Sequence, residues 1–160
     1  MTTTIRIQRG DFSVAGEVAA LTGGRPDIGA VVTFTGLCRD EGGRLEALEL
    51  EHYPAMAEEE LRRVAGEAAA RWPLDGITVI HRFGRLVPGD NIVLVATASA
   101  HRRTAFEAAA FLMDFLKTRA PFWKREHLTD GSVGGWVEAQ GEDTAAVERW
   151  AVSSSSAGRG

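Results

Sequence analysis

The sequence predicts a single α+β domain in which helices flank a mixed, largely antiparallel β-sheet. The predicted elements follow the order β-α-β-β-α-β-β-α-β-β along the 160 residues. Two apolar segments, residues 77–82 and 91–98, enclose the sequence VPGD at 87–90, which is typical of the turn in an antiparallel hairpin. Residues 45–53 alternate apolar and charged side chains, as a strand exposed on one face does. Tight turns and alternating strands favour this class over a doubly wound parallel sheet.

The amino-terminal part contains two strand candidates on either side of a short helix. In residues 3–8 the apolar side chains Ile5 and Ile7 alternate with polar ones, which is typical of a strand. Residues 12–21 predict a helix, and Asp11 or Ser13 supplies the side chain that caps its first turn. Residues 30–36, AVVTFTG, are β-branched and apolar, so they predict a buried strand.

The middle of the chain predicts a helix directly after the alternating strand at 45–53. Pro54 closes that strand, and residues 56–72 carry apolar side chains at helical spacing. Three glutamates at 58–60 lie in the first turns, where the helix dipole favours negative charge. Pro73 ends this helix.

A third helix, rich in apolar residues, lies within residues 99–126, and basic residues mark both of its ends. It is predicted to stop before Pro121, which cannot continue a helix. One predicted apolar face consists of Phe106, Ala109, Ala110, Met113 and Leu116. A second consists of Phe111, Leu112 and Phe115. Two apolar faces predict that this helix is covered on two sides.

The carboxyl-terminal part predicts two more strands, at 123–128 and 135–139, around a glycine-rich loop. Residues 142–150 predict a short helix. The last ten residues, AVSSSSAGRG at 151–160, have the composition of a disordered tail. We therefore expect one domain over residues 1–150, followed by that tail.

Composition and charge exclude several classes of protein. The net charge of −4 and the pI of about 5.6 argue against general nucleic-acid binding. No segment has the ~20 apolar residues of a membrane span, and no secretory signal is recognisable at the amino terminus. The single cysteine excludes an internal disulfide and fits a reducing compartment. We therefore expect a cytoplasmic protein.

The local charge at the end of the third helix points to an anionic ligand. From Lys117 to Arg125 there are four basic residues and no acidic one. A turn at Pro121 would bring the ammonium groups of Lys117 and Lys124 to one cleft. The alternative interpretation is structural: Lys117 would only complement the helix dipole, and Lys124 would be a solvated strand residue.

Other common site motifs are absent or ambiguous. No phosphate-binding glycine loop or nucleophile elbow occurs. The histidines at 52, 81, 101 and 127 form no i, i+4 pair, so we expect no metal site. His52 and His81, at strand ends, are interpreted as structural. Cys38 lies near a basic loop that would activate a thiol, but no partner base is identifiable, so an unreactive thiol is the preferred interpretation.

Six sequence blocks resemble one known family. They are VVTFTG, LEHYPAM, RWPL, VIHRFGRLVPGD, SAHR and DFLKTRAPFWKRE, at 31–36, 50–56, 71–74, 79–90, 99–102 and 114–126. Together they resemble the catalytic (large) subunit of molybdopterin synthase, in order and with close spacing, from about residue 29 to residue 150. The loops at 40–44 and 129–135 and the tail match poorly.

The resemblance implies a fold, an activity and partners. The family has an α/β hammerhead fold, which is compatible with the α+β class predicted above. Its large subunit forms a homodimer, and each copy binds a small ubiquitin-like sulfur carrier, giving a heterotetramer. The carrier's Gly-Gly tail ends in a thiocarboxylate, whose sulfur converts cyclic pyranopterin monophosphate to the dithiolene of molybdopterin. No cofactor or metal is implied.

The resemblance also implies which residues act. The family's substrate pocket corresponds here to Leu37, Cys38, Arg39, His101, Arg102, Lys117, Lys124, Arg125 and Glu126. Lys117 is the first choice for the catalytic residue and Lys124 the second. In this family sulfur comes from the carrier, so we interpret Cys38 as lining the pocket and not as a sulfur relay.

These residue types suit the implied chemistry. Arginine binds phosphate through paired, charge-assisted hydrogen bonds, so Arg39 and Arg102, with His101, are the expected phosphate and pterin contacts. Ammonium groups stabilise the oxyanion that forms when sulfur is transferred. Burial and neighbouring cations are expected to lower the pKa of Lys117, which would suit it to proton transfer.

Two other functions are compatible with the sequence. One is a non-catalytic module that binds a ubiquitin-like tail, although the joint presence of Arg39, His101, Lys117 and Lys124 argues against it. The other is a hydrolase or binding protein for a different phosphorylated pterin or nucleotide. Only the sulfurtransferase would form dithiolene from a thiocarboxylated carrier and the precursor.

Overall fold

The computed structural model describes residues 1–138 and residue 150. The strands in this part of the chain are β1 (Thr2–Gln8), β2 (Ala30–Leu37), β3 (Leu45–His52), β4 (Gly76–Arg82), β5 (Gly84–Leu86), β6 (Asn91–Ser99), β7 (Phe122–Leu128) and β8 (Val137–Glu138). The helices are α1 (Val14–Thr22), α2 (Pro54–Arg71) and α3 (Arg102–Arg119). Among the described residues, no helix is both long and apolar enough to cross a membrane.

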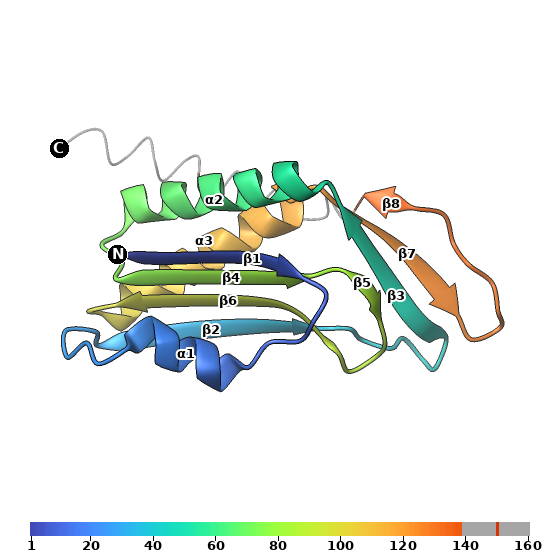
Figure 1. Cartoon of the computed structure of the whole chain (residues 1–160), viewed down its shortest axis with the longest axis horizontal. Helices are drawn as coiled ribbons and strands as arrows, with labels where there is room; N and C mark the ends of the chain where they lie inside the picture. Colours follow the sequence, from blue (N-terminus) through green and yellow to red (C-terminus); the bar gives the residue numbers. More distant parts are fainter. Residues whose placement is uncertain (139–149, 151–160) are drawn as a thin grey trace.

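The strands form two sheets of four strands each (Figure 1). The first has the order β1-β4-β6-β2, in which β1 runs parallel to β4 and the other pairs are antiparallel. The second has the order β5-β3-β7-β8 and is antiparallel throughout. The α+β class with mixed, largely antiparallel pairing is confirmed. The sequence predicted one sheet, whereas the structure divides the strands between two.

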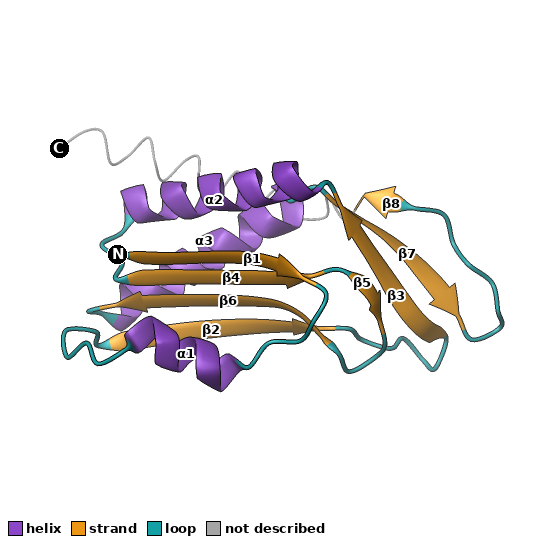
Figure 2. Ribbon diagram, in the orientation of Figure 1, coloured by secondary structure: helices purple, strands orange, loops and turns teal. Residues whose placement is uncertain are grey.

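The helices lie on both faces of the first sheet, and the second sheet extends beyond one end of it (Figure 2). Helices α2 and α3 pack on one face and on each other, whereas α1 packs on the opposite face. The main core lies between the helix pair and the sheet, where Leu61, Phe111, Leu112, Ile77 and Val95 are almost fully buried. Burial of these apolar side chains is the dominant stabilising term for such a layer.

Helix α3 ends where the sequence predicts. Ala120 is extended, with φ −66° and ψ 123°, and Pro121 follows it. At the other end, the Thr97 hydroxyl donates to the Ala105 carbonyl at 2.7 Å, which ties the first turns of α3 to β6. The prediction that Phe106 belongs to a buried face is wrong, because its side chain is 62% exposed.

The structure corrects the predicted elements in two other places. Strand β5 was not predicted, because three residues are too few for a periodicity signal. It begins at Gly84, whose φ of 94° favours glycine. Helix α2 begins at Pro54, which is tolerated in a first helical turn, and not at residue 56.

The predictions at the carboxyl terminus meet the limit of the described residues. The strand predicted at 135–139 appears as the two residues of β8, and residue 139 lies outside the described part. Residues 142–149 of the predicted short helix and the tail at 151–160 also lie outside it. Trp150 is described, and its buried ring packs edge-on against Trp72 and Phe111.

Candidate functional site

Two neighbouring cavities lie where the two sheets meet, and they share Leu37, Leu48, Ile92 and Lys124. The first, named here the apolar cavity, has a volume of about 260 Å³. The second, named the charged cavity, has a volume of about 340 Å³. Apart from the shared residues, the apolar cavity is lined by Phe34, Gly36, Leu50, His81, Val93, Met113, Leu116, Lys117, Ala120 and Phe122. The charged cavity is lined by Cys38, Arg39, Glu41, Arg44, Leu45, Glu126 and Leu128.

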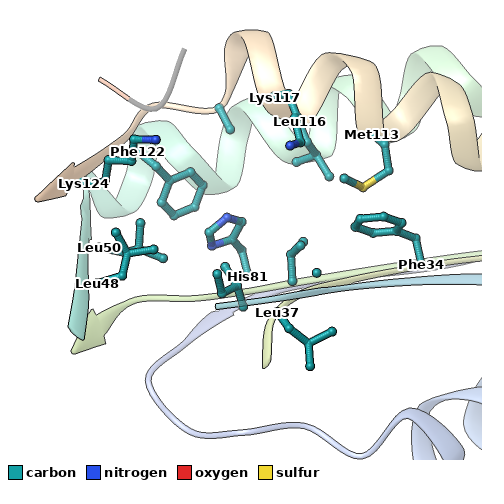
Figure 3. A pocket seen from close by; sticks show the side chains of 14 residues that line it. Phe34, Leu37, Leu48, Leu50, His81, Met113, Leu116, Lys117, Phe122 and Lys124 are labelled. Carbon is teal, nitrogen blue, oxygen red and sulfur yellow. The ribbon is translucent and has the colours of Figure 1, made fainter. Parts of the chain in front are cut away.

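Lys117 and Lys124 reach the apolar cavity from different elements. Lys117 lies in the last turn of α3, and Lys124 lies on β7, three residues after Pro121. Figure 3 shows both side chains among those that line the cavity. The turn at Pro121 therefore brings them to one cleft, as expected. The expected burial of Lys117 is not found, because its side chain is exposed in the single chain.

The charged cavity is lined by the three predicted site residues at the end of β2, Leu37, Cys38 and Arg39. Leu37 and Arg39 are exposed, and Arg39 donates a hydrogen bond to Glu41 at 2.9 Å. Cys38 is buried. Burial, followed by the charge of Asp90, raises the pKa of its thiol, which disfavours the reactive thiolate. The preferred interpretation of Cys38 as an unreactive lining residue is consistent with this environment.

His101 and Arg102 lie far from both cavities in the same chain. Arg102 begins α3 and Lys117 lies 15 residues later, so about 22 Å of helix separates them at ~1.5 Å per residue. The segment before α3 packs against Gly29, where an added Cβ would lie 2.1 Å from the Ala100 carbonyl oxygen. One chain therefore does not bring His101 and Arg102 together with Arg39. Their assignment to the substrate pocket stays a prediction.

Arg125 points away from Lys124 and Glu126, because neighbouring side chains of a strand face opposite sides. It is not among the described residues that line either cavity. Its guanidinium lies 3.0 Å from the Glu49 carboxylate on β3 and 4.5 Å from the centre of the Trp136 ring. The hydrogen bond from Arg125, with a further one from His127, holds the pKa of Glu49 below its usual range. In the single chain Arg125 thus connects β7 to β3, and its assignment to substrate binding stays a prediction.

His81 is a cavity residue that the sequence interpretation treated as structural. Its ring lines the apolar cavity and stacks on Phe122, with ring centres 3.8 Å apart (Figure 3). Burial lowers its pKa to about 4, with a smaller contribution from His52, so the ring is neutral at pH 7. Nothing in the sequence distinguished it from any other histidine at a strand end. Phe34 and Met113 also line this cavity, and likewise carried no functional signal.

The low pKa of His81 predicts that acid destabilises the fold through this residue. Its folded pKa lies below the ordinary value of 6.5, so the unfolded chain takes up the proton first as the pH falls. The associated stability is present above about pH 6.5 and is lost toward pH 4. Between pH 7 and 5 we expect a loss of about 2 kcal/mol in unfolding free energy from this group.

Urea denaturation at both pH values, compared between the native chain and His81→Phe, measures this contribution. The variant should lack that part of the pH dependence. Equal pH dependence in the two proteins would contradict the assignment.

Comparison with known proteins identifies the family. The family model described as "MoaE protein" matches residues 7–119. The molybdopterin synthase catalytic subunit of Mesorhizobium japonicum is 70% identical over 151 residues, which are 94% of this chain and 95% of that protein. The one from Escherichia coli is 54% identical over 141 residues, which are 87% of this chain and 92% of that protein.

Solved structures agree with these relatives. The molybdopterin biosynthesis MoaE protein from Burkholderia ambifaria superposes with a TM-score of 0.83 at 49% identity, covering 94% of this chain and 99% of that one. Molybdopterin synthase from Staphylococcus aureus gives a TM-score of 0.72 at 32% identity, covering 81% and 95%. The family model spans more than half of the chain, and the identities extend over most of it. The chain therefore belongs to the family of molybdopterin synthase catalytic subunits, enzyme subunits of molybdopterin biosynthesis.

Proposed function

We propose that this chain transfers sulfur from the thiocarboxylated tail of a small carrier to cyclic pyranopterin monophosphate, at the two joined cavities. The observation that carries the proposal is the placement of Lys117 and Lys124, from separate elements, at one cavity that adjoins a second one bearing Arg39. Both reactants are anions, so a cationic junction gathers them. Ammonium groups there stabilise the oxyanion formed at the acyl carbon.

The cavities suit different parts of the reactants. The charged cavity presents the guanidinium groups of Arg39 and Arg44, which match the geometry of a phosphate. The apolar cavity has a volume of about 260 Å³ and is lined by side chains such as Leu50 and Phe122, and a Gly-Gly tail has no side chains to obstruct its entry into such a space. Lys124 borders both cavities, which supports a role for it where the carrier's sulfur would meet the precursor.

We propose that the active form is a homodimer in which a second copy supplies His101 and Arg102. Those residues lie about 22 Å along α3 from Lys117, so they reach a shared substrate only from another chain. Exposed apolar side chains on α3 and β2, Phe106, Phe34 and Leu37, support an interface on that side. Each copy binds one carrier, which gives a heterotetramer. The buried, unpaired Cys38 fits the expected cytoplasmic location.

A reconstitution assay tests this function. The purified chain, a thiocarboxylated carrier and the precursor should together yield dithiolene, and omission of the carrier should abolish the product. Carrier binding without dithiolene would instead identify a binding module. Turnover of a phosphorylated pterin without the carrier would identify a hydrolase.

Arg39→Ala should weaken precursor binding by about 1.5–3 kcal/mol, the range for a hydrogen bond to a charged group. The change removes a guanidinium at the charged cavity and leaves the fold intact, because the Arg39 side chain is 81% exposed. Calorimetric titration of the precursor measures the loss. Arg62→Ala is the matched control, because Arg62 pairs with Glu58 on the surface of α2. Equal affinity in both variants would remove Arg39 from the site.

A further inference from the structure

Among the described residues that line the apolar cavity, one is a neutral proton acceptor. Three side chains among its described lining residues can carry a proton: His81, Lys117 and Lys124. A lysine ammonium offers hydrogen-bond donors only, whereas a neutral imidazole offers one donor and one acceptor. Lys117 and Lys124 therefore provide positive charge and protons, and His81 provides the lone pair.

The surroundings of His81 select which ring nitrogen carries that lone pair. Its Nδ1 lies 2.8 Å from the carbonyl oxygen of Arg82, and because a carbonyl only accepts, Nδ1 must hold the proton. Nε2 is then the acceptor. The ring also lies nearly parallel to Phe122, at an interplanar angle of 18°. Figure 3 shows the His81 ring projecting into the cavity, with Phe122 on one side of it and Leu37 and Phe34 on the other.

The proposed sulfur transfer requires a second chemical step. When the thiocarboxylate sulfur displaces an oxygen substituent from a carbon of the precursor, the carbon–oxygen bond breaks with its electron pair on oxygen. The carrier then remains attached to that carbon through an acyl–sulfur bond, a thioester. A free dithiolene sulfur is obtained only when water cleaves that bond. Water is a weak nucleophile, and a positioned base that takes its proton accelerates such a step by ~10²–10⁴-fold.

We propose that His81 is a catalytic residue of this second step, and that its Nε2 accepts the proton of the water that cleaves the thioester. The water oxygen adds to the acyl carbon, and the carbon–sulfur bond then breaks with its electron pair on sulfur. The imidazolium returns the proton to that sulfur, and the new carboxylic acid loses its own proton to solvent. The products are the carrier carboxylate, a thiol on the pterin and one proton.

Burial and charge suit His81 to this role. With a pKa of about 4, the ring holds its lone pair free at neutral pH and does not form an ion pair with the incoming thiocarboxylate. The charged or titratable groups around it are Lys117 on α3, Lys124 on β7 and His52 on β3. The tetrahedral oxyanion that forms beside the ring favours the imidazolium, so the proton is taken up only as that charge develops.

Two variants test the proposal, which rests on the proposed function. His81→Phe keeps a ring against Phe122 and removes both nitrogens. His81→Asn keeps a donor for the Arg82 carbonyl and removes the Nε2 acceptor. The native chain or a variant is mixed with thiocarboxylated carrier and precursor, quenched at intervals, and the intact mass of the carrier is measured.

We expect both variants to consume thiocarboxylate and to accumulate a carrier whose mass is increased by that of the pterin. Cleavage of this adduct should be slowed by ~10²–10⁴-fold. Hydroxylamine, which attacks thioesters directly, should release it. His52→Phe is the matched control: the same change is made at a histidine beside Phe122 that is not among the described residues lining the cavity, and it should leave no adduct.

Three results would overturn the assignment of His81. They are release of the carrier carboxylate at the native rate, slow consumption of thiocarboxylate without an adduct, and failure of both variants to fold, which would assign the ring to packing. If the native chain consumes no thiocarboxylate, the proposed function is wrong, and the proposed role of His81, which depends on that function, is wrong as well. That outcome is distinct, because it appears before any variant is compared.

Discussion

Lys117→Arg should lower the single-turnover rate of dithiolene formation by ~10²–10⁴-fold, the range for loss of a general acid–base group. Arginine retains the positive charge but does not release a proton at any working pH. Lys117 lines the cavity and is exposed, so its ammonium can donate to the sulfur or the oxyanion at the acyl carbon. The variant should fold and bind carrier, because the exposed side chain adds nothing to the core. The measurement is conversion of precursor with thiocarboxylated carrier in excess.

Two further variants make this result specific. Lys124→Arg should be less damaging, because a residue that orients the phosphate or the carrier tail needs charge more than proton exchange. Arg62→Lys, on the exposed surface of α2, should have no effect. A near-normal rate for Lys117→Arg would reduce Lys117 to an electrostatic role and would remove proton transfer from its function.

Mixing two inactive variants should restore activity if the site is shared between copies. Lys117→Ala and Arg102→Ala homodimers should each lose at least ~10²-fold in rate, because every site lacks one group. In a mixed dimer one site lacks both groups, and the other takes Lys117 and Arg102 from intact chains. Random exchange makes half of the dimers mixed, so a twofold-symmetric assembly should regain about a quarter of native activity.

The same experiment distinguishes a shared site from a site built within one chain. In that case each chain of the mixed dimer carries one defect, and no site is intact, so mixing would restore nothing. Arg39→Ala mixed with Lys117→Ala is the control, because both residues reach the joined cavities from one chain, and this pair should not complement. Light scattering that finds a monomer at micromolar concentration, with carrier present, would rule out the dimer.

Local features of the fold could be read from the sequence because their causes are local. Pro121 ends α3, the β-branched segment at 30–36 forms a strand, and the two strands predicted before and after the turn at 87–90 pair antiparallel as β4 and β6. That turn itself joins β5 to β6, because β5 lies between the paired strands in the chain. Each of these predicted features depends on backbone restriction or side-chain periodicity over a few residues. The same signals said nothing of Gly84–Leu86, whose strand exists only because β3 lies beside it. They also placed Phe106 in a buried face, although no described element covers it.

The candidate site also combines features that the sequence determined with features that only the tertiary structure decided. The sequence by itself determined the residue types of the reaction, a basic segment with two lysines on either side of Pro121, because those residues are close along the chain. Only the tertiary structure decided that Lys124 joins the cavities while Arg125 pairs with Glu49 on the other face of β7. The tertiary structure also placed His81 beside Phe122. His101 and Lys117 lie at opposite ends of α3. Such choices depend on which strands pair and where a helix begins, and these follow from packing between segments that are distant in sequence.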